Sequence, residues 1–350
     1  ERQATRWGHD EGHVIFAGRK VALPRPRVRS AEGKEIPLVR YQAFAHPQRL
    51  QEAVGQRILR RVSTRDYAGV LDEVCEGYGI QKSSVSRQWK ALSEQQLHQL
   101  LERPLGELDL CAVLLDGKEF QDFTLIVALG VDRQGRKHVL GLWSGATENA
   151  VVCGALLDDL IARGLSVDKP YLVILDGAKA LKKAVTSRFG SKALIQRCRV
   201  HKKRNIQKYL PQKYHGMLAL KLRLAWGMTE YDKALQELRK VHDWLASINQ
   251  AAAASLEEGM EETLTINRLG LPPQLRRLFS STNMIESCFS RAGDLCRRVT
   301  RWRDGNMARR WAGALLLEAE KRFRRIQAYR QLPMLLNALP RVLDKQEAVA

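Results

Sequence analysis

The sequence has no uninterrupted apolar segment that approaches the ~20 residues a helix needs to cross a lipid bilayer. It also lacks a basic N-terminal stretch followed by an apolar one, which is the pattern of a secretory signal. We therefore expect a cytoplasmic protein that has no membrane as its partner. Because the sequence starts at Glu1 and not at a methionine, we also expect that N-terminal residues are missing from it.

The Cys-x-x-Cys motif is absent as well, since none of the six cysteines lies three residues from another. Several lie in apolar runs, which is typical of reduced thiols in a cytosolic protein. Cys198 and His201 have the spacing of two zinc ligands, but no second pair of ligands stands at a familiar distance along the chain. The sequence therefore disfavours a structural zinc site. The cysteines are Cys75, Cys111, Cys153, Cys198, Cys288 and Cys296.

Acidic residues are scarce relative to basic ones: 38 Asp and Glu stand against 58 Lys and Arg, which gives a net charge of +20. The charge is clustered, because residues 195–225 contain nine basic and no acidic side chains, and residues 287–350 contain fourteen against six. Such clusters favour a polyanionic partner, above all nucleic acid. The length of 350 residues allows two or three domains.

Two apolar runs of buried-strand length each end in an aspartate followed by a glycine. Asp116 follows residues 108–115, and Asp176 follows residues 171–175. This pattern predicts strands that end at the rim of a sheet, where open α/β folds bind ligands. Asp-Gly is also an ordinary turn signal, so either aspartate alone is ambiguous. As a pair they favour a site for a hard cation, which a basic ribosomal or membrane-surface protein would not need.

The segments around these aspartates predict an α/β fold. Their order is strand, hairpin, helix, strand, helix, strand, helix, which gives a mixed sheet of three antiparallel strands followed by parallel ones. This is the sheet of a ribonuclease-H-like nuclease core, since a purely parallel Rossmann sheet would not begin with a hairpin. After the first strand, the expected elements are strands 123–132 and 137–143, helix 149–163, strand 171–175, helix 178–189, strand 193–196 and helix 200–209.

A β-rich N-terminal segment precedes the core, with a hairpin expected around Glu32 and Gly33. Within it, Arg25, Arg27 and Arg29 alternate and would share one strand face. These arginines either lie along a phosphate backbone or form a solvated strand face, and the sequence leaves both interpretations open.

A helical segment then contains a pattern similar to a helix-turn-helix, with a first helix at residues 64–77 and a recognition helix at residues 81–92. Small hydroxyls with Lys and Arg early in such a helix suit contacts with phosphates and base edges in a major groove. The DNA contacts expected from this helix are Lys82, Ser84, Arg87 and Lys90.

A third acid is expected from another element, because two-metal phosphoryl transfer needs carboxylates around two cations roughly 3.5–4 Å apart. Residues 211–279 read as a helical insertion without a catalytic cluster, and Glu286 follows it at the start of a new helix. Asn283-x-x-Glu286 also reads as a capping box with Asn283 as the N-cap, so position alone leaves the role of Glu286 open. Within the insertion, Trp226 either packs in the core, which we favour, or stacks on an extruded base.

Four stretches in this order resemble mutator-type transposases of bacterial insertion sequences, over about residues 50–325. They are Leu-Asp116-Gly, Leu-Asp176-Gly-Ala-Lys-Ala-Leu, Gln196-Arg-Cys198-Arg-Val-His201-Lys-Lys-Arg-Asn205 and Ser281-Thr-Asn-Met-Ile-Glu286-Ser. The resemblance implies an Asp-Asp-Glu active site in a ribonuclease-H-like fold that a helical insertion interrupts before the glutamate. Asp116, Asp176 and Glu286 would then be the catalytic residues and metal ligands. Cys198 and His201 carry the Cys-x-x-His signature and are expected to be near the site or structural.

The implied function is a DNA transposase that binds the terminal inverted repeats of its element and catalyses strand cleavage and strand transfer with Mg²⁺, or with Mn²⁺ as a substitute. Two element ends must meet, so we expect a homodimer or a larger assembly on double-stranded element and target DNA, in the bacterial nucleoid. The alternatives are a structure-selective nuclease of the same core, such as a junction resolvase, and a non-catalytic DNA-binding regulator.

Further DNA contacts are expected from Lys202, Lys203 and Arg204 of the basic helix and from a basic residue beyond Glu286. Arg291 lies off the helical face of Glu286, whereas Arg297 returns to it three turns later, and the choice between them stays open. The expected domains are a β-rich segment (1–46), a helical DNA-binding domain (47–104), the first part of the core (105–210), the insertion (211–279), the last part of the core (280–330) and a C-terminal tail (331–350).

Overall fold

The structure is a computed structural model and describes residues 4–60, 67, 81–120, 123–145, 150–296, 299 and 302–347. Contacts between residues divide the chain into two compact units. The first comprises residues 1–98 and 293–300, and the second comprises residues 99–292 and 301–350. The six expected domains are a finer division than these units, and their boundaries stay predictions.

The first unit begins with two antiparallel strand pairs, which confirms that the N-terminal segment is β-rich. β1 (Ala4–Asp10) pairs with β4 (Arg25–Ser30), and β2 (His13–Phe16) pairs with β3 (Arg19–Ala22). The helices that follow are α1 (Val39–Ala45), α2 (Pro47–Leu59) and α3 (Lys82–Glu102), of which the residues up to His98 belong to this unit. The expected first helix of the helix-turn-helix lies outside the described residues, apart from Tyr67.

Two of the three alternating arginines of β4 lie close to carboxylates of their own unit. Arg25 Nη2 lies 2.7 Å from an oxygen of Asp10. Arg27 Nη2 lies 3.3 Å from an oxygen of Glu35, across the hairpin that the sequence predicts. Since these ion pairs are partly exposed, a phosphate can replace either carboxylate, and both interpretations of these arginines stay open.

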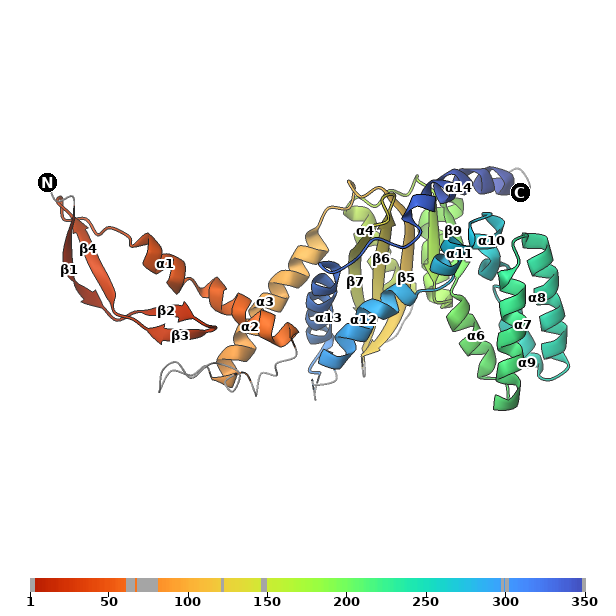
Figure 1. The fold of residues 1–350 in the computed structure, drawn as a ribbon, viewed down its shortest axis with the longest axis horizontal. Coiled ribbons are helices and arrows are strands. Elements are labelled where there is room, and N and C mark those ends of the chain that lie inside the picture. Colours follow the sequence, from red (N-terminus) through yellow and green to blue (C-terminus); the bar gives the residue numbers. More distant parts are fainter. Residues whose placement is uncertain are drawn as a thin grey trace. The chain divides into compact units, whose positions relative to one another are not determined.

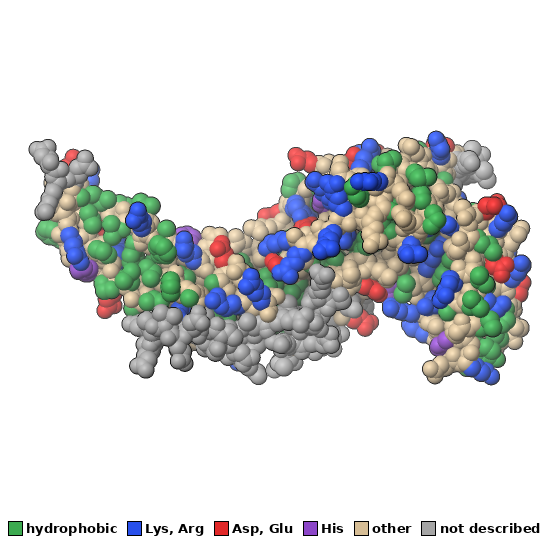
Figure 2. Space-filling model, viewed as in Figure 1, with side chains coloured by type: hydrophobic (Ala, Val, Ile, Leu, Met, Phe, Trp, Pro, Cys, Tyr) green, Lys and Arg blue, Asp and Glu red, His purple; other side chains and the backbone are tan. Residues whose placement is uncertain are grey.

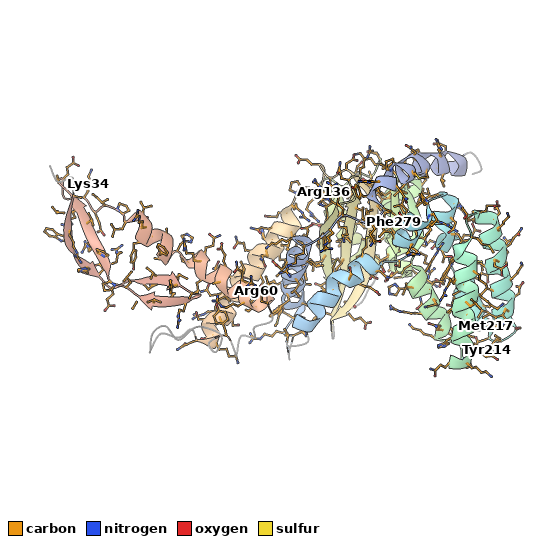
Figure 3. The ribbon with its side chains drawn as sticks, in the orientation of Figure 1. Lys34, Arg60, Arg136, Tyr214, Met217 and Phe279 are labelled. Carbon is orange, nitrogen blue, oxygen red and sulfur yellow. The ribbon has the colours of Figure 1, made fainter. Side chains whose placement is uncertain are left out.

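The second unit is built on a five-stranded mixed sheet with the order β7-β6-β5-β8-β9 (Figure 1). β5, β6 and β7 are antiparallel neighbours, whereas β8 runs parallel to β5, and β9 runs parallel to β8. The predicted order of a strand, a hairpin and then parallel strands is therefore confirmed. The strands are β5 (Leu110–Phe120), β6 (Phe123–Asp132), β7 (Lys137–Gly145), β8 (Tyr171–Leu175) and β9 (Ala193–Arg197). Arg136, labelled in Figure 3, lies in the tight turn between β6 and β7, where its N–H donates to Asp132 Oδ1 at 2.8 Å.

Alternation along the central strands assigns their side chains to the two faces of the sheet. Val113 and Leu115 of β5 pack in one apolar cluster with Val173 and Leu175 of β8. Residues of α4 (Ala150–Ala162) and α5 (Lys179–Phe189) complete this cluster. Asp116 is the next residue after Leu115, so its side chain belongs to the face opposite these two helices.

The insertion is helical, as the sequence predicts, and has an apolar core of its own. In α8 (Tyr231–Ala246), Ala234, Leu238, Val241 and Leu245 recur with helical spacing and are all buried. α6 (Arg199–Gln207) leads into the insertion. The described elements of the insertion are η3 (Gln212–Tyr214), α7 (His215–Gly227), α8 (Tyr231–Ala246), α9 (Gln250–Glu257), η4 (Glu261–Leu264), α10 (Thr265–Arg268) and α11 (Pro273–Phe279).

The chain returns from the insertion into α12 (Asn283–Cys296). α13 (Gly305–Glu320) packs against β6 and β7. It is capped by Asp304, whose Oδ1 accepts the N–H of Met307 at 2.7 Å. The remaining elements are η2 (Gly190–Lys192), η5 (Tyr329–Gln331) and α14 (Leu332–Glu347). In the part of the chain that the structure describes, no helix is both long and apolar enough to span a membrane.

Candidate active site

Asp116 and Asp176 occupy equivalent places on neighbouring strands. In the parallel pairing of β5 with β8, Leu115 lies opposite Leu175, and each aspartate is the next residue. Since neighbouring strands lie about 4.8 Å apart, the two aspartates begin side by side. The expectation that Asp116 ends its strand was wrong. β5 continues to Phe120, and Asp116 lies opposite Val127 of β6, because the hairpin pairing extends through the Asp-Gly pair.

Asp116 is a buried carboxylate. Only 5% of its surface is exposed, and among the described residues its Oδ1 has no hydrogen-bond partner. Burial raises the pKa of Asp116 to about 7, the nearby His201 opposes this rise, and the negative charges of Asp176 and Glu286 add to it. The third predicted acid is therefore close enough to Asp116 for its charge to be felt there. A cation bound at this place would relieve the cost of keeping Asp116 ionised.

Asp176 begins the turn that leads from β8 into α5. Its Oδ1 accepts the N–H of Ala178 at 2.9 Å, which is a local bond typical of Asp in turns. Gly177 has a φ of +106°, a conformation that favours glycine. Its carbonyl accepts a hydrogen bond of 2.8 Å from Nη2 of Arg197, at the end of β9. Arg197 thus fixes the backbone directly after the second aspartate.

Glu286 comes near the aspartates because the two ends of the insertion are joined. The N–H of Arg199 donates to the carbonyl of Ser280 at 2.9 Å. Next to this bond, the N–H of Thr282 donates to Sγ of Cys198 at 3.5 Å. The start of α12 is therefore fastened to the start of α6, and Glu286 lies in the first turn of α12.

The side chain of Glu286 faces α6. Its Oε1 lies 3.2 Å from Nη1 of Arg204 and 3.8 Å from Nε2 of His201. Asn283 is the first residue of α12, and its N–H donates to Oγ of Ser281 at 3.4 Å. These contacts do not correspond to the capping box, in which Glu286 would bond the N–H of Asn283.

Cys198 and His201 connect the insertion to the acids. Cys198 is fully buried, and its sulfur also accepts the hydroxyl of Thr282 at 3.6 Å. The interaction with Cys198 raises the pKa of His201 to about 9 against the effect of burial, and the charges of Asp116 and Asp176 contribute. The surroundings of His201 therefore favour its protonated form, and Cys198 holds the start of α12. Both positions agree with a role near the site or in its structure.

The donor chemistry of the acids fits a hard cation, although Glu286 is paired with Arg204. Among the residues that the structure describes, no group of three or more His, Cys, Asp and Glu side chains is arranged to hold a metal ion. The aspartates nevertheless offer carboxylate oxygens on adjacent strands, including the buried and unpaired Oδ1 of Asp116. Such oxygens are the ligands that Mg²⁺ and Mn²⁺ prefer. The set would be completed if the Glu286 side chain turned from Arg204 towards the aspartates.

Residues 1–325 match the model of a family described as "Transposase, Mutator family". The chain belongs to the Mutator family of transposases. It is 29% identical over 301 residues to a transposase for insertion sequence element ISRM5 of Rhizobium meliloti (strain 1021). The matched region covers 82% of this chain and 72% of that relative. It is 25% identical over 295 residues to a transposase for insertion sequence element IS256 in transposon Tn4001 of Staphylococcus aureus, with coverage of 81% and 73%. A transposase for insertion sequence element IS6120 of Mycolicibacterium smegmatis is 26% identical over 251 residues, with coverage of 69% and 75%.

In this Mutator-family transposase, one of the expected DNA contacts lies in the interior. Lys202 is 1% exposed, and its ammonium group donates to the carbonyls of Ser255 and Glu258. It is therefore not available to a phosphate in this structure, because the helical turn of α6 directs it towards the insertion. Lys203 is half-buried, and Arg204 is exposed beside Glu286.

The other expected DNA contacts belong to two helices. Lys82, Arg87 and Lys90 are exposed on α3, and Ser84 is half-buried there. Arg291 lies in α12, but its side chain and all of Arg297 are outside the described residues. Lys and Arg side chains are spread over both units on the face drawn in Figure 2, as the net charge implies.

Two residues that the sequence did not single out also support the acids. Both lie in the stretches that resemble mutator-type transposases. Arg197 holds the turn after Asp176, and Thr282 is fully buried against Cys198. The only indication of their role in the sequence is that they lie within these stretches. Trp226 follows the core interpretation, since it packs against the apolar core of the insertion and its Nε1 donates to Thr263 Oγ1 at 3.1 Å.

Proposed function

We propose that this protein is a DNA transposase that binds the ends of its element, cleaves DNA strands there and joins them to target DNA. We also propose that the second unit is a ribonuclease-H-like core, interrupted by the helical insertion. The mixed sheet, in which a hairpin is followed by parallel strands, supports this assignment. The membership in the Mutator family supports the reaction.

One observation carries the assignment of the active site: Asp116 and Asp176 are adjacent in register, and a buried Asp116 oxygen has no partner among the described residues. Asp116 and Asp176 would hold the metal ions, with Glu286 as the third carboxylate. When bound, Mg²⁺ or its substitute Mn²⁺ would supply the positive charge that activates the attacking oxygen and stabilises the leaving one. The scissile phosphate would lie against the rim where the two aspartates stand.

The remaining residues of the site act on these carboxylates. Arg197 and Gly177 fix the backbone that presents Asp176. Cys198 fixes the start of α12, and hence the position of Glu286. Arg204 and His201 balance the charge of Glu286 before a metal is bound. The excess positive charge of the chain serves to bind DNA, so affinity should fall steeply with salt. We expect two copies or more to assemble on DNA, since two element ends must meet.

The test compares Asp176→Asn with Asp243→Asn, an exposed aspartate on α8 of the insertion. The substrate is a duplex that ends with the terminal sequence of the element, supplied with Mg²⁺ and a target plasmid. We expect Asp176→Asn to lower cleavage and strand transfer by more than about 100-fold and to keep DNA binding, whereas Asp243→Asn keeps all three. Wild-type products limited to nicked DNA would identify a nuclease. Wild-type binding without any cleavage would identify a regulator and overturn the proposal.

A further inference from the structure

A cleft opens at the turn from β8 into α5, between α5 and the segment that follows α9, and Asp176 itself is not among the residues that line it. Its volume is about 550 Å³, and Leu175 and Gly177, on either side of Asp176 in the chain, belong to its lining. Arg197 and Ile195 of β9 form its floor, and Glu258, Gly259 and Glu262 form the wall opposite α5. Among the described residues, none of the predicted DNA contacts lines this cleft.

The wall formed by α5 carries only hydrogen-bond donors and hydroxyls. Positions 179, 182, 183, 186 and 187 follow the spacing of a single helical face. α5 contains no acidic residue at all, so nothing on this helix repels an anion. The face extends along the helix for about 12 Å from the turn at Asp176. The residues are Lys179, Lys182, Lys183, Thr186 and Ser187.

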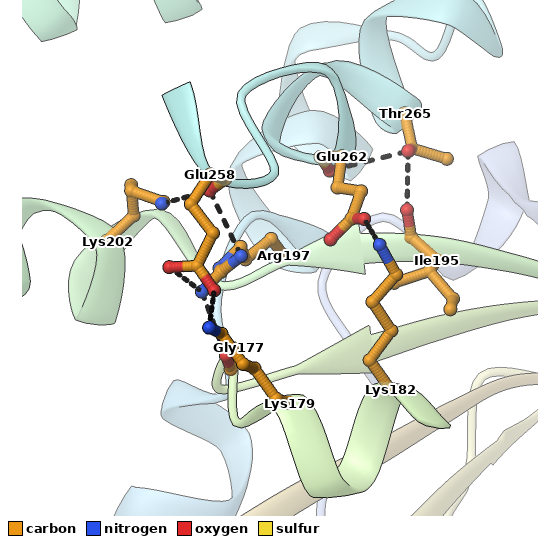
Figure 4. A network of polar contacts seen from close by, with 9 residues as sticks. All are labelled: Gly177, Lys179, Lys182, Ile195, Arg197, Lys202, Glu258, Glu262 and Thr265. Atoms are coloured by element: carbon orange, nitrogen blue, oxygen red, sulfur yellow. Dashed lines mark hydrogen bonds and ion pairs between the residues drawn. The ribbon is translucent and has the colours of Figure 1, made fainter. Parts of the chain in front are cut away.

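The opposite wall supplies carboxylates that pair with these cations across the cleft (Figure 4). Lys182 forms an ion pair with Glu262, and Lys179 Nζ lies 4.0 Å from Glu258 Oε1. Glu258 also accepts from Nη2 of Arg197 at 3.3 Å. Lys179 and Lys182 are 88% and 52% exposed, so these ion pairs are solvated and contribute little to stability. An anion that enters the cleft can therefore replace a carboxylate as their partner.

The acidic wall is itself held firmly. Lys202 donates to the carbonyls of Ser255 and Glu258 at the end of α9, and Thr265 Oγ1 donates to the carbonyl of Ile195 at 2.5 Å (Figure 4). The cleft therefore has two fixed walls whose exposed side chains can exchange partners.

We propose that this cleft binds the sugar–phosphate backbone of a DNA strand that passes the turn at Asp176 on its way to the active site. This inference rests on the proposed function and adds the path of the DNA. Phosphates pair with Lys182, Lys183 and Lys179, and Glu262 and Glu258 are the partners that they displace. The two carboxylates hold the lysines in place without DNA and weaken the binding of any strand that reaches too few of these lysines.

The experiment measures binding of the full chain to a fluorescein-labelled duplex of the element end, by anisotropy in EDTA and over a range of salt concentrations. We expect Lys182→Ala combined with Lys183→Ala to lower the affinity about threefold or more and to reduce the slope of log K against log salt by about 0.9 for each phosphate that is no longer neutralised. Glu262→Gln should do the opposite and tighten binding, because it releases Lys182. The matched controls are Lys240→Ala and Glu237→Gln, which break an exposed ion pair of 3.0 Å on α8, outside the cleft.

A second measurement tests whether the DNA lies in the cleft. A photocrosslinking amino acid at Thr186, which is exposed in the cleft, should capture the labelled DNA, whereas the same group at exposed Ser247 of the insertion should not. The proposal is overturned if the double lysine variant binds like Lys240→Ala, if Glu262→Gln binds DNA no better than wild type, or if Thr186 captures no more DNA than Ser247. Because EDTA prevents metal-dependent cleavage, these results are independent of the Asp176→Asn assay. The proposal for the cleft can therefore be refuted while the assignment of the active site holds, and the reverse is also possible.

Discussion

Replacing Lys202 by methionine tests whether this lysine supports the insertion or contacts DNA. The ammonium donates to two carbonyls, those of Ser255 and Glu258. Each hydrogen bond from a charged donor contributes about 1.5–3 kcal/mol, or about 3–6 kcal/mol for the pair. Against this stands the burial of a charge. Burial, and then the charge of Arg197, lower the pKa of Lys202 from 10.5 to about 8, which corresponds to about 3 kcal/mol.

The balance of these terms predicts that Lys202→Met destabilises the protein by about 0–3 kcal/mol near neutral pH, centred on about 1.5 kcal/mol. Urea denaturation should show a lower midpoint with an unchanged slope. The DNA affinity of the folded variant and its salt dependence should equal those of wild type, because the side chain is buried.

The difference in stability should also depend on pH. Between about 8 and 10.5 the unfolded chain retains a proton on Lys202 that the folded chain has lost, so the stability of wild type rises with pH in this window. Methionine has no such proton. The gap between wild type and Lys202→Met should therefore widen by about 1 kcal/mol from about pH 7 to about pH 9. A gap that stays constant, or a variant with weakened DNA binding and unchanged stability, would contradict a structural role for Lys202.

Two further predictions concern the acids. Gly177→Ala places a Cβ 2.5 Å from Nε of Arg197 in a backbone with a φ of +106°, so it should lower stability by about 1–3 kcal/mol and also reduce cleavage. Gly190→Ala, with a φ of +52° and open space around its Cβ, should lower stability less and leave cleavage intact; equal losses of cleavage would contradict the role of the turn. Arg204→Met removes a partner of Glu286, so the Mg²⁺ concentration for half-maximal cleavage should fall several-fold, while Lys203→Met on the same helix leaves it unchanged. A higher Mg²⁺ requirement for Arg204→Met would show that Arg204 supports the metal site instead of competing with it.

The sheet could be predicted from the sequence because its strands are short apolar runs separated by clear turn and helix signals. The residue at which β5 ends could not be predicted from the sequence. Asp116-Gly117 and Asp176-Gly177 are the same dipeptide after similar runs, but only Gly177 adopts a positive φ. Gly117 stays extended because Ile126 of β6 pairs with it. Whether such a dipeptide turns depends on the neighbouring strand, which a local pattern does not contain.

Two side-chain assignments failed to follow from local pattern for a similar reason. Lys202, Lys203 and Arg204 are one basic run in the sequence, but a helix directs consecutive residues to different sides, and the insertion covers the first of them. The capping-box alternative for Glu286 assumed that Asn283 precedes the helix, whereas Asn283 is its first residue. In both cases the deciding contact comes from a segment far away in the chain.

The junction between Cys198–Arg199 and Ser280–Thr282 has a consequence for the protein during its synthesis. A ribosome delivers both aspartates and the sheet strands first, then the whole insertion, and the glutamate only afterwards. Glu286 reaches its position only after the insertion has folded and Cys198–Arg199 has met Ser280–Thr282. A chain that ends before residue 280 would thus contain Asp116 and Asp176 without Glu286, and under the proposed function it would lack the third carboxylate.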